Sequence, residues 1–238
     1  EVVDGQGLVL CPGFIDMHSH SDLYRFHPGA SGVPLGDIPK LQQGCTHQVL
    51  GQDGYSAAPV RRGDAHDYAL YISGLDGQLG KEFPWESFEE YVHANALQPG
   101  TRTSHLVGHS TIRRAVMGMD NRLANAEDLR KMTRELDLAL RTGARGLSTG
   151  LVYAPASFSD EAEVVELCRV LARHDSVLFI HLRSESTNVL SAAEEVLEAS
   201  RLAGSRLHIS HIKTAGSANW HLTPALLEMV DNYRKNGL

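Results

Sequence analysis

His18 and His20 have the spacing of two ligands to one metal ion. They end the segment Pro12-Gly-Phe-Ile-Asp-Met-His-Ser-His20, which begins as an apolar run. Residues two apart on a β-strand share a face, so both imidazoles are expected to point to the same side. Imidazole nitrogens bind zinc at about 2.0–2.1 Å. This first pair therefore indicates a divalent metal site, although two polar residues at a strand end without an ion fit the spacing equally well.

His181 and His211 form a second candidate pair. Each closes an apolar run, 177–181 and 207–211 respectively. The carboxyl ends of parallel strands lie at one edge of a sheet, where barrel enzymes hold their active sites. A single histidine there is more often a hydrogen-bonded core residue, but two at equivalent positions, together with the first pair, favour a metal role. We expect His208, three residues before His211, to face the helices and to have no catalytic role.

Asp53 and Lys213 are the other candidates for chemistry. Asp53 lies between Gly51 and Gly54, just beyond an apolar run. A carboxylate there could complete or bridge a zinc site, and the alternative is an ordinary Asp-Gly turn. Lys213 lies two residues beyond His211 and shares its expected inward face. A cation beside a metal suits a substrate carboxylate, unless the side chain only reaches solvent.

Alternating strands and helices are expected to position these residues. Apolar runs predict strands, and amphipathic stretches between them predict helices. The predicted strands are 8–18, 45–50, 101–107, 145–148, 177–182 and 207–212, and the predicted helices are 86–96, 125–142, 160–174, 188–203 and 224–235. This order indicates an α/β fold of the (β/α)8 TIM-barrel type, with parallel strands and right-handed crossovers. We count about six strand–helix units of the eight in such a barrel, so residues 1–238 are expected to form an incomplete barrel.

Composition excludes several classes of partner. The 238 residues carry a formal net charge of −7 without a basic stripe, which argues against nucleic acid and anionic membranes. The apolar runs are too short to span a bilayer. Cys11, Cys45 and Cys168 are odd in number and far apart, which argues against a disulfide framework and favours a cytoplasmic location. The 13 histidines are a high count for this length and agree with a metal site.

Residues 12–20 resemble the strand-one signature of the amidohydrolase superfamily, and in detail they are similar to one branch, the N-acyl-D-amino-acid deacylases (D-aminoacylases). Asp22 follows the His-x-His motif, as it often does in that branch. Further segments resemble successive strands and loops of this family, in the same order: 43–46, 51–59, 106–118, 143–153, 181–185 and 210–213. The resemblance extends over nearly all of the 238 residues.

The resemblance implies a metal-dependent hydrolase that binds zinc. By this resemblance, His181 and His211 would be ligands of a tightly bound zinc ion, and His18 and His20 would line a second, weaker zinc site. The family often has Cys where Asp53 stands, and a carboxylate makes a harder site, which leaves open whether one or two ions bind. The resemblance also implies a small β-domain, built partly from segments outside this sequence, to which about residues 1–10 would belong.

The resemblance further implies how a small-molecule substrate is held. Lys213, together with Tyr153, would bind the α-carboxylate of an N-acyl amino acid. The general acid/base of the family is an Asp after the last strands and is expected beyond residue 238, so no residue of this sequence is assigned that role. The expected reaction is zinc-dependent hydrolysis of the amide bond of N-acyl amino acids, with N-acyl-D-amino acids as the expected class, giving a carboxylate and the free amino acid.

Two alternatives stay open. A cyclic-amide hydrolase, of the hydantoinase or dihydroorotase kind, usually bridges two metals with a carboxylated Lys, and the predicted strand end at 146–150 contains no Lys. A metal-free, non-catalytic barrel is the other alternative, and the presence of all four histidines argues against it. We also expect the segment to be inactive alone, because an incomplete barrel leaves open edges.

Overall fold

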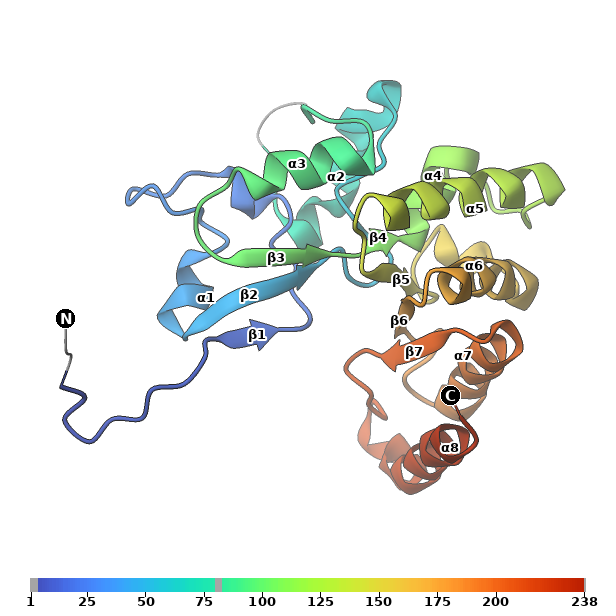
Figure 1. Ribbon diagram of the computed structural model, residues 1–238. Helices are drawn as coiled ribbons and strands as arrows, with labels where there is room; N and C mark the ends of the chain where they lie inside the picture. Colours follow the sequence, from blue (N-terminus) through green and yellow to red (C-terminus); the bar gives the residue numbers. More distant parts are fainter. Residues whose placement is uncertain (1–3, 80–82, 238) are drawn as a thin grey trace.

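The structure is a computed structural model, and it describes residues 4–79 and 83–237 (Figure 1). Within these ranges, parallel strands form a sheet of order β1-β2-β3 and a sheet of order β4-β5-β6-β7. The strands are β1 (Phe14–Asp16), β2 (Cys45–Leu50), β3 (Arg102–His105), β4 (Val107–Gly108), β5 (Gly146–Gly150), β6 (Val177–His181) and β7 (Arg206–Ile209). The fold is therefore α/β with parallel sheets, as the sequence predicts.

The two sheets meet at Leu106, the residue that separates β3 from β4. The Leu106 N–H donates to Leu50 O at 2.9 Å, and the Arg145 N–H donates to His105 O at 2.8 Å. Leu106 also packs with Val49 and Phe179 in a small buried cluster that joins the two sheets. Because the strands are parallel and the sheets join here, the carboxyl ends of β2, β5 and β6 face one region.

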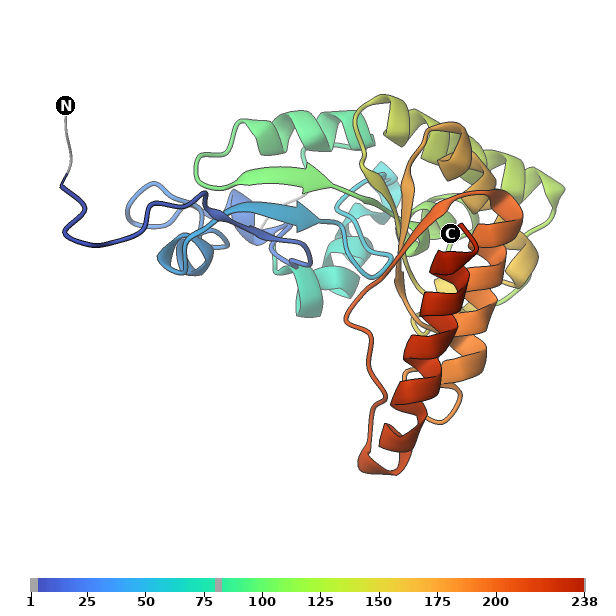
Figure 2. The ribbon, with the colours of Figure 1, turned by 60° about the horizontal axis from the view of Figure 1, so that its bottom comes forward.

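Helices follow the strands along the chain, and the later ones cover the second sheet. They are α1 (Ile38–Gln42), α2 (Ala65–Asp76), α3 (Phe88–Ala96), α4 (His109–Met117), α5 (Ala126–Arg141), α6 (Glu161–Arg173), α7 (Val189–Ala203) and α8 (Thr223–Lys235), with short 3-10 helices at Tyr24–Phe26, Arg62–Asp64, Ala156–Phe158 and Ser217–Leu222. The main apolar core lies between α4–α8 and the β4–β7 sheet. In Figure 2, α7 and α8 lie side by side. None of the described helices is both long and apolar enough to cross a bilayer.

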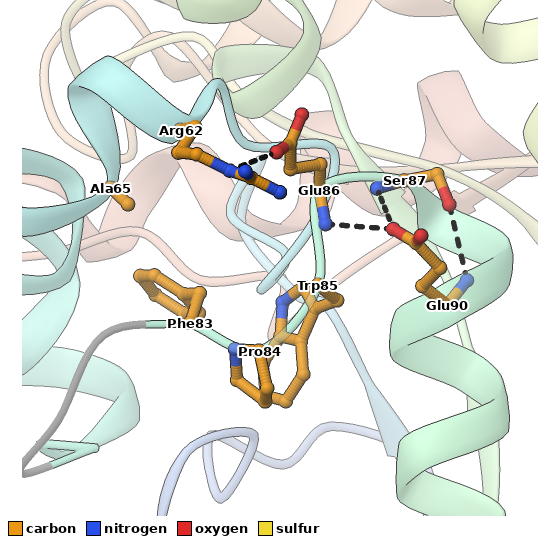
Figure 3. Close-up of a pocket in the computed structure, with 8 residues that line it drawn as sticks. All are labelled: Arg62, Ala65, Phe83, Pro84, Trp85, Glu86, Ser87 and Glu90. Atoms are coloured by element: carbon orange, nitrogen blue, oxygen red, sulfur yellow. Dashed lines mark hydrogen bonds and ion pairs between the residues drawn. The ribbon is translucent and has the colours of Figure 1, made fainter.

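Local sequence signals explain where the long helices begin. Ser87 caps α3: its hydroxyl accepts from Glu90 N at 3.2 Å, and the Glu90 carboxylate accepts from Ser87 N at 2.9 Å (Figure 3). This is a capping box, in which two orphan N–H groups at the start of the helix are satisfied reciprocally. Asn125 and Asp128 form a second such box at the start of α5.

Several predicted elements differ from the structure. The first strand is confined to Phe14–Asp16, and Leu8, Val9 and Leu10 of the predicted strand 8–18 are exposed. Helix α2 was not predicted, because its sequence includes Ser73 and Gly74, which are weak helix formers. Helix α4 was also not predicted.

Candidate metal centre

The structure brings the first pair, the second pair and Asp53 together. They form two groups that share Asp53: His18, His20 and Asp53, and Asp53, His181 and His211. In each group, one donor atom per residue lies within 4.8 Å of the others. All five residues follow or end a strand on its carboxyl side. The ends of the strands therefore bring these five side chains together, as the strand-end argument from the sequence predicts.

The Asp53 carboxylate divides its two oxygens between the two pairs. Its Oδ2 lies 3.4 Å from His18 Nε2 and 3.3 Å from His20 Nε2. Its Oδ1 lies 3.4 Å from His211 Nε2 and 3.7 Å from His181 Nδ1. Within the pairs, the facing nitrogens are 3.2 Å and 3.1 Å apart. One carboxylate thus stands between four imidazoles.

The backbone around Asp53 takes an unusual conformation to reach this position. Asp53 has φ +54°, and His211 has φ +36°, a region that residues other than glycine seldom adopt. Gly150 lets the Asp53 loop approach β5 closely, because a Cβ at Gly150 would lie 2.4 Å from Asp53 O. Strained backbone of this kind often accompanies functional sites. Sequence reasoning could not foresee these two positive φ angles.

A divalent cation fits this set of donors. In a tetrahedral zinc site with bonds of about 2.0–2.1 Å, ligand atoms lie about 3.3 Å apart, and the facing atoms of the second group are 3.1–3.7 Å apart. Among the described residues, none donates a hydrogen bond to Asp53 Oδ1, which is buried. A buried carboxylate oxygen without a donor is unfavourable unless a cation lies near it. The mixture of nitrogen and oxygen donors suits zinc.

Charges at the first pair are strongly coupled to two buried carboxylates. Burial opposes charge on His20, but its bonds to Asp53 and Asp76 outweigh this effect and raise the pKa of His20 to about 10. Burial alone would raise the pKa of Asp53, yet the adjacent imidazoles, His18 first, hold it well below its usual range. Burial, with the nearby Asp76 charge, raises the pKa of Asp22 to about 8. The site therefore favours a positive charge next to Asp53.

Two carboxylates that the sequence did not single out lie behind the histidines. Asp76, at the end of α2, is fully buried and lies 3.1 Å from His20 Nδ1. Glu185, in the loop after β6, lies 3.3 Å from His181 Nε2 and 3.0 Å from His211 Nδ1. Asp76 could not be identified from the sequence because helix α2 was not predicted. Glu185 gave a weak signal, as an acidic residue four positions after His181 in a loop at the carboxyl end of a strand.

The two predicted substrate ligands lie beside the second pair. Lys213 Nζ is 2.8 Å from His211 Nδ1 and 2.5 Å from Glu185 Oε1. The Tyr153 ring lies with its centroid 5.0 Å from that of His181. Burial first, and then the charges of Asp53 and Glu185, raise the pKa of Tyr153. The structure thus brings both residues to the predicted region.

The prediction that His208 faces the helices is wrong. His208 pairs in register with Phe179 and stacks on its ring at 4.7 Å, and Phe179 belongs to the cluster that joins the sheets. The prediction carried strand alternation back from His211, but β7 ends at Ile209 and His211 lies in a turn with positive φ. Alternation therefore does not extend between the two histidines.

A separate hollow of about 660 Å³ lies around the start of α3 (Figure 3). Its polar side chains already have partners: Arg62 pairs with Glu86 at 2.6 Å, and Ser87 and Glu90 form the capping box. It contains neither group of candidate metal ligands. We therefore assign the chemistry to the cluster around Asp53.

Comparison with known proteins identifies the family. No protein-family model matches the chain. The chain is 36% identical, over 232 residues, to an N-acyl-D-aspartate deacylase of Alcaligenes xylosoxydans xylosoxydans; the match covers 96% of this chain and 44% of that protein. The chain spans about half the length of the curated deacylases it matches.

Solved structures agree with this similarity. An N-acyl-D-glutamate deacylase from Bordetella bronchiseptica, complexed with zinc and a phosphonate inhibitor, matches with TM-score 0.79 and 32% identity over 95% of this chain and 45% of that chain. A D-aminoacylase studied for its binuclear metal centre matches with TM-score 0.80 and 32% identity over 94% of this chain and 45% of that one. The parallel α/β fold and the histidine–aspartate cluster thus define an amidohydrolase. Within that superfamily, the chain belongs to the N-acyl-D-amino-acid deacylase (D-aminoacylase) family.

Proposed function

We propose that the whole protein hydrolyses the amide bond of N-acyl amino acids, with N-acyl-D-amino acids as its substrate class. One observation carries the proposal: the Asp53 carboxylate presents one oxygen to each histidine pair. The family supports the same reaction, since relatives named for the hydrolysis of N-acyl-D-amino acids match along 96% or more of this chain.

We assign zinc as the metal, with His181, His211 and Asp53 as ligands of a tight ion. His18 and His20, with the other oxygen of Asp53, would hold a second and weaker ion. Zinc bound here would polarise the substrate carbonyl and lower the pKa of bound water toward about 7. The full proton-transfer route also needs the Asp that the family resemblance puts outside residues 1–238.

Residues of this chain would orient the substrate. Lys213 has a side chain that is 44% exposed, so its ammonium can reach a carboxylate in solution while it stays beside His211. The Tyr153 hydroxyl would add a second donor next to the second pair. Two donors on one side of the cluster would fix the amino-acid end, and the acyl carbonyl would then face Asp53 and the histidines.

We propose that the two sheets belong to a (β/α)8 barrel and that the first residues belong to a small β-domain of the whole protein. The support is the shared direction of the parallel strands and the site at their carboxyl ends, the usual place in such barrels. A cytoplasmic location is proposed as well, since all three cysteines are free.

The rival cyclic-amide activity has less support. It would call for a carboxylated Lys between two ions, whereas Asp53 stands between the two histidine pairs and β5 has the sequence Gly-Leu-Ser-Thr-Gly. Assays of the full protein against N-acetyl-D-amino acids, N-acetyl-L-amino acids and hydantoins separate these activities and test the chirality directly.

The metal assignment is tested by His211→Ala in the full protein. We expect loss of the tight zinc, measured by atomic absorption after dialysis, together with loss of amide hydrolysis. His208→Ala is the matched control, because His208 is a nearby histidine outside both ligand groups, and it should retain both properties. Zinc or activity that survives His211→Ala would contradict the proposal.

A further inference from the structure

The second pair is held between two carboxylates, one on each side of the rings. Asp53 Oδ1 faces His181 Nδ1 and His211 Nε2. On the opposite side, Glu185 Oε2 faces His181 Nε2 at 3.3 Å, and Glu185 Oε1 faces His211 Nδ1 at 3.0 Å. Each oxygen of Glu185 thus serves the outward nitrogen of a different imidazole.

Glu185 is itself fixed in this position by neighbouring groups. Its side chain is 14% exposed, and Lys213 Nζ lies 2.5 Å from Oε1. Its carbonyl oxygen accepts from Ala215 N at 2.5 Å, which ties the loop after β6 to the loop after β7. The loop that carries Glu185 is therefore tied to the loop that carries His211.

We propose that Glu185 is a positioning residue that orients both imidazoles of the second pair toward a shared metal ion; this rests on the proposed function. A neutral imidazole has one N–H and one lone pair. Glu185 favours the N–H at His181 Nε2 and at His211 Nδ1, which leaves both lone pairs directed at the Asp53 side. Outer carboxylates that hold a ligating histidine in this way also raise its basicity.

Lys213 completes this arrangement. Lys213 Nζ also lies 2.8 Å from His211 Nδ1, and because an ammonium only donates, it competes with Glu185 Oε1 for that nitrogen. With the proton on Nδ1, both Nδ1 and the ammonium donate to Glu185 Oε1. The positive charge of Lys213 offsets part of the negative charge that Glu185 brings next to the metal site. Two rings, one carboxylate and one ammonium thus form a connected unit behind the ligand atoms.

Substitution of Glu185 in the full protein tests the proposal. Glu185→Gln keeps the shape but leaves a single acceptor oxygen, which can serve only one ring. We expect zinc affinity at the tight site, measured by competition with a chromophoric chelator, to fall about 10–100-fold. The visible spectrum of the Co²⁺-substituted protein should change as well, because the ligand orientation changes. Glu195→Gln is the matched control: Glu195 pairs with Arg183 nearby and not with the histidines, and affinity should be unchanged.

A second variant tests whether Glu185 must contact both rings or whether its negative charge alone is enough. Glu185→Asp keeps the charge but is one methylene shorter, so it should not reach both rings and should also lose affinity. Full affinity in Glu185→Asp, or in Glu185→Gln, would overturn the proposal. Suppose that the wild-type protein binds zinc and that His211→Ala loses it. If Glu185→Gln then keeps zinc, only the role of Glu185 fails. If wild-type protein binds no zinc, the proposed function fails with it.

Discussion

The first and second histidine pairs are supported by carboxylates of different kinds. Asp76 is fully buried at the end of α2 and contacts His20 but not His18. Glu185 lies in a partly open loop and contacts both members of the second pair. The first pair is therefore held through the packed core, and the second through an ionic unit at the site itself.

The difference shows two ways in which a candidate metal ligand can be held in place. Burial at the first pair is unfavourable to the carboxylates and raises the pKa values of Asp22 and Asp76. Tyr91 O–H offsets part of this by donating to Asp22 at 3.0 Å. At the second pair, Lys213 supplies a countercharge that offsets part of the charge of Glu185. Substitutions at the first and second pairs should therefore have distinct effects on metal binding and on stability.

The largest effect is expected at the residue that both pairs share. Asp53→Ala removes the oxygens that face all four imidazoles, so zinc should be lost at both pairs. The loss in affinity should exceed the about 10–100-fold typical of outer partners, as measured by zinc content and by competition with a chelator. Asp64→Ala is the control. It removes a carboxylate that pairs with Arg114 and belongs to neither group of candidate ligands. Zinc retained at one pair only would show that Asp53 is not shared.

A smaller and one-sided effect is expected from Asp76→Asn. The amide cannot reproduce the carboxylate that holds His20, so the weaker zinc should bind about 10–100-fold less tightly. The tight zinc provides the internal control and should keep its affinity. Titration with zinc, followed by calorimetry, distinguishes the two steps. Equal weakening of both steps would remove the distinction between the pairs.

The smallest effect concerns acid stability and depends on His105, the buried last residue of β3. Burial first, with the charges of Arg25 and His47, lowers the pKa of His105 from 6.5 to about 3. Below pH 6.5 the unfolded chain takes up a proton that the folded chain does not, so stability falls as the pH falls toward 3. Between pH 7.5 and 6 the resulting loss in the free energy of unfolding is roughly 1 kcal/mol.

Urea unfolding of wild type and His105→Gln at the two pH values measures this contribution. The variant should lose roughly 1 kcal/mol less on acidification than the wild type. His66→Gln changes an exposed histidine and serves as the control. An identical loss in wild type and His105→Gln would show that His105 takes up its proton in the folded protein.

The sequence allowed the clustering of the four histidines and Asp53 to be predicted better than the groups that support them. Strand-end positions are visible as apolar runs, and the relevant strands are parallel, so His181 and His211 could be expected to meet. Asp76 could not be found, because its helix has a weak pattern. The contacts of Glu185 depend on how two loops approach each other, which no local pattern encodes. His208 was misplaced because the last strand ends two residues before His211.

A ligand shared by two ions makes their occupancies interdependent. Under the proposed assignment, an ion on one oxygen of Asp53 withdraws electron density from the other oxygen and so weakens the opposite site. Thermodynamic linkage requires the effect to be mutual: the factor by which the first ion changes the affinity for the second equals the factor in the reverse direction. Metal supply could then set how many ions the protein carries, and equilibrium titrations started from either singly loaded form would have to yield the same factor.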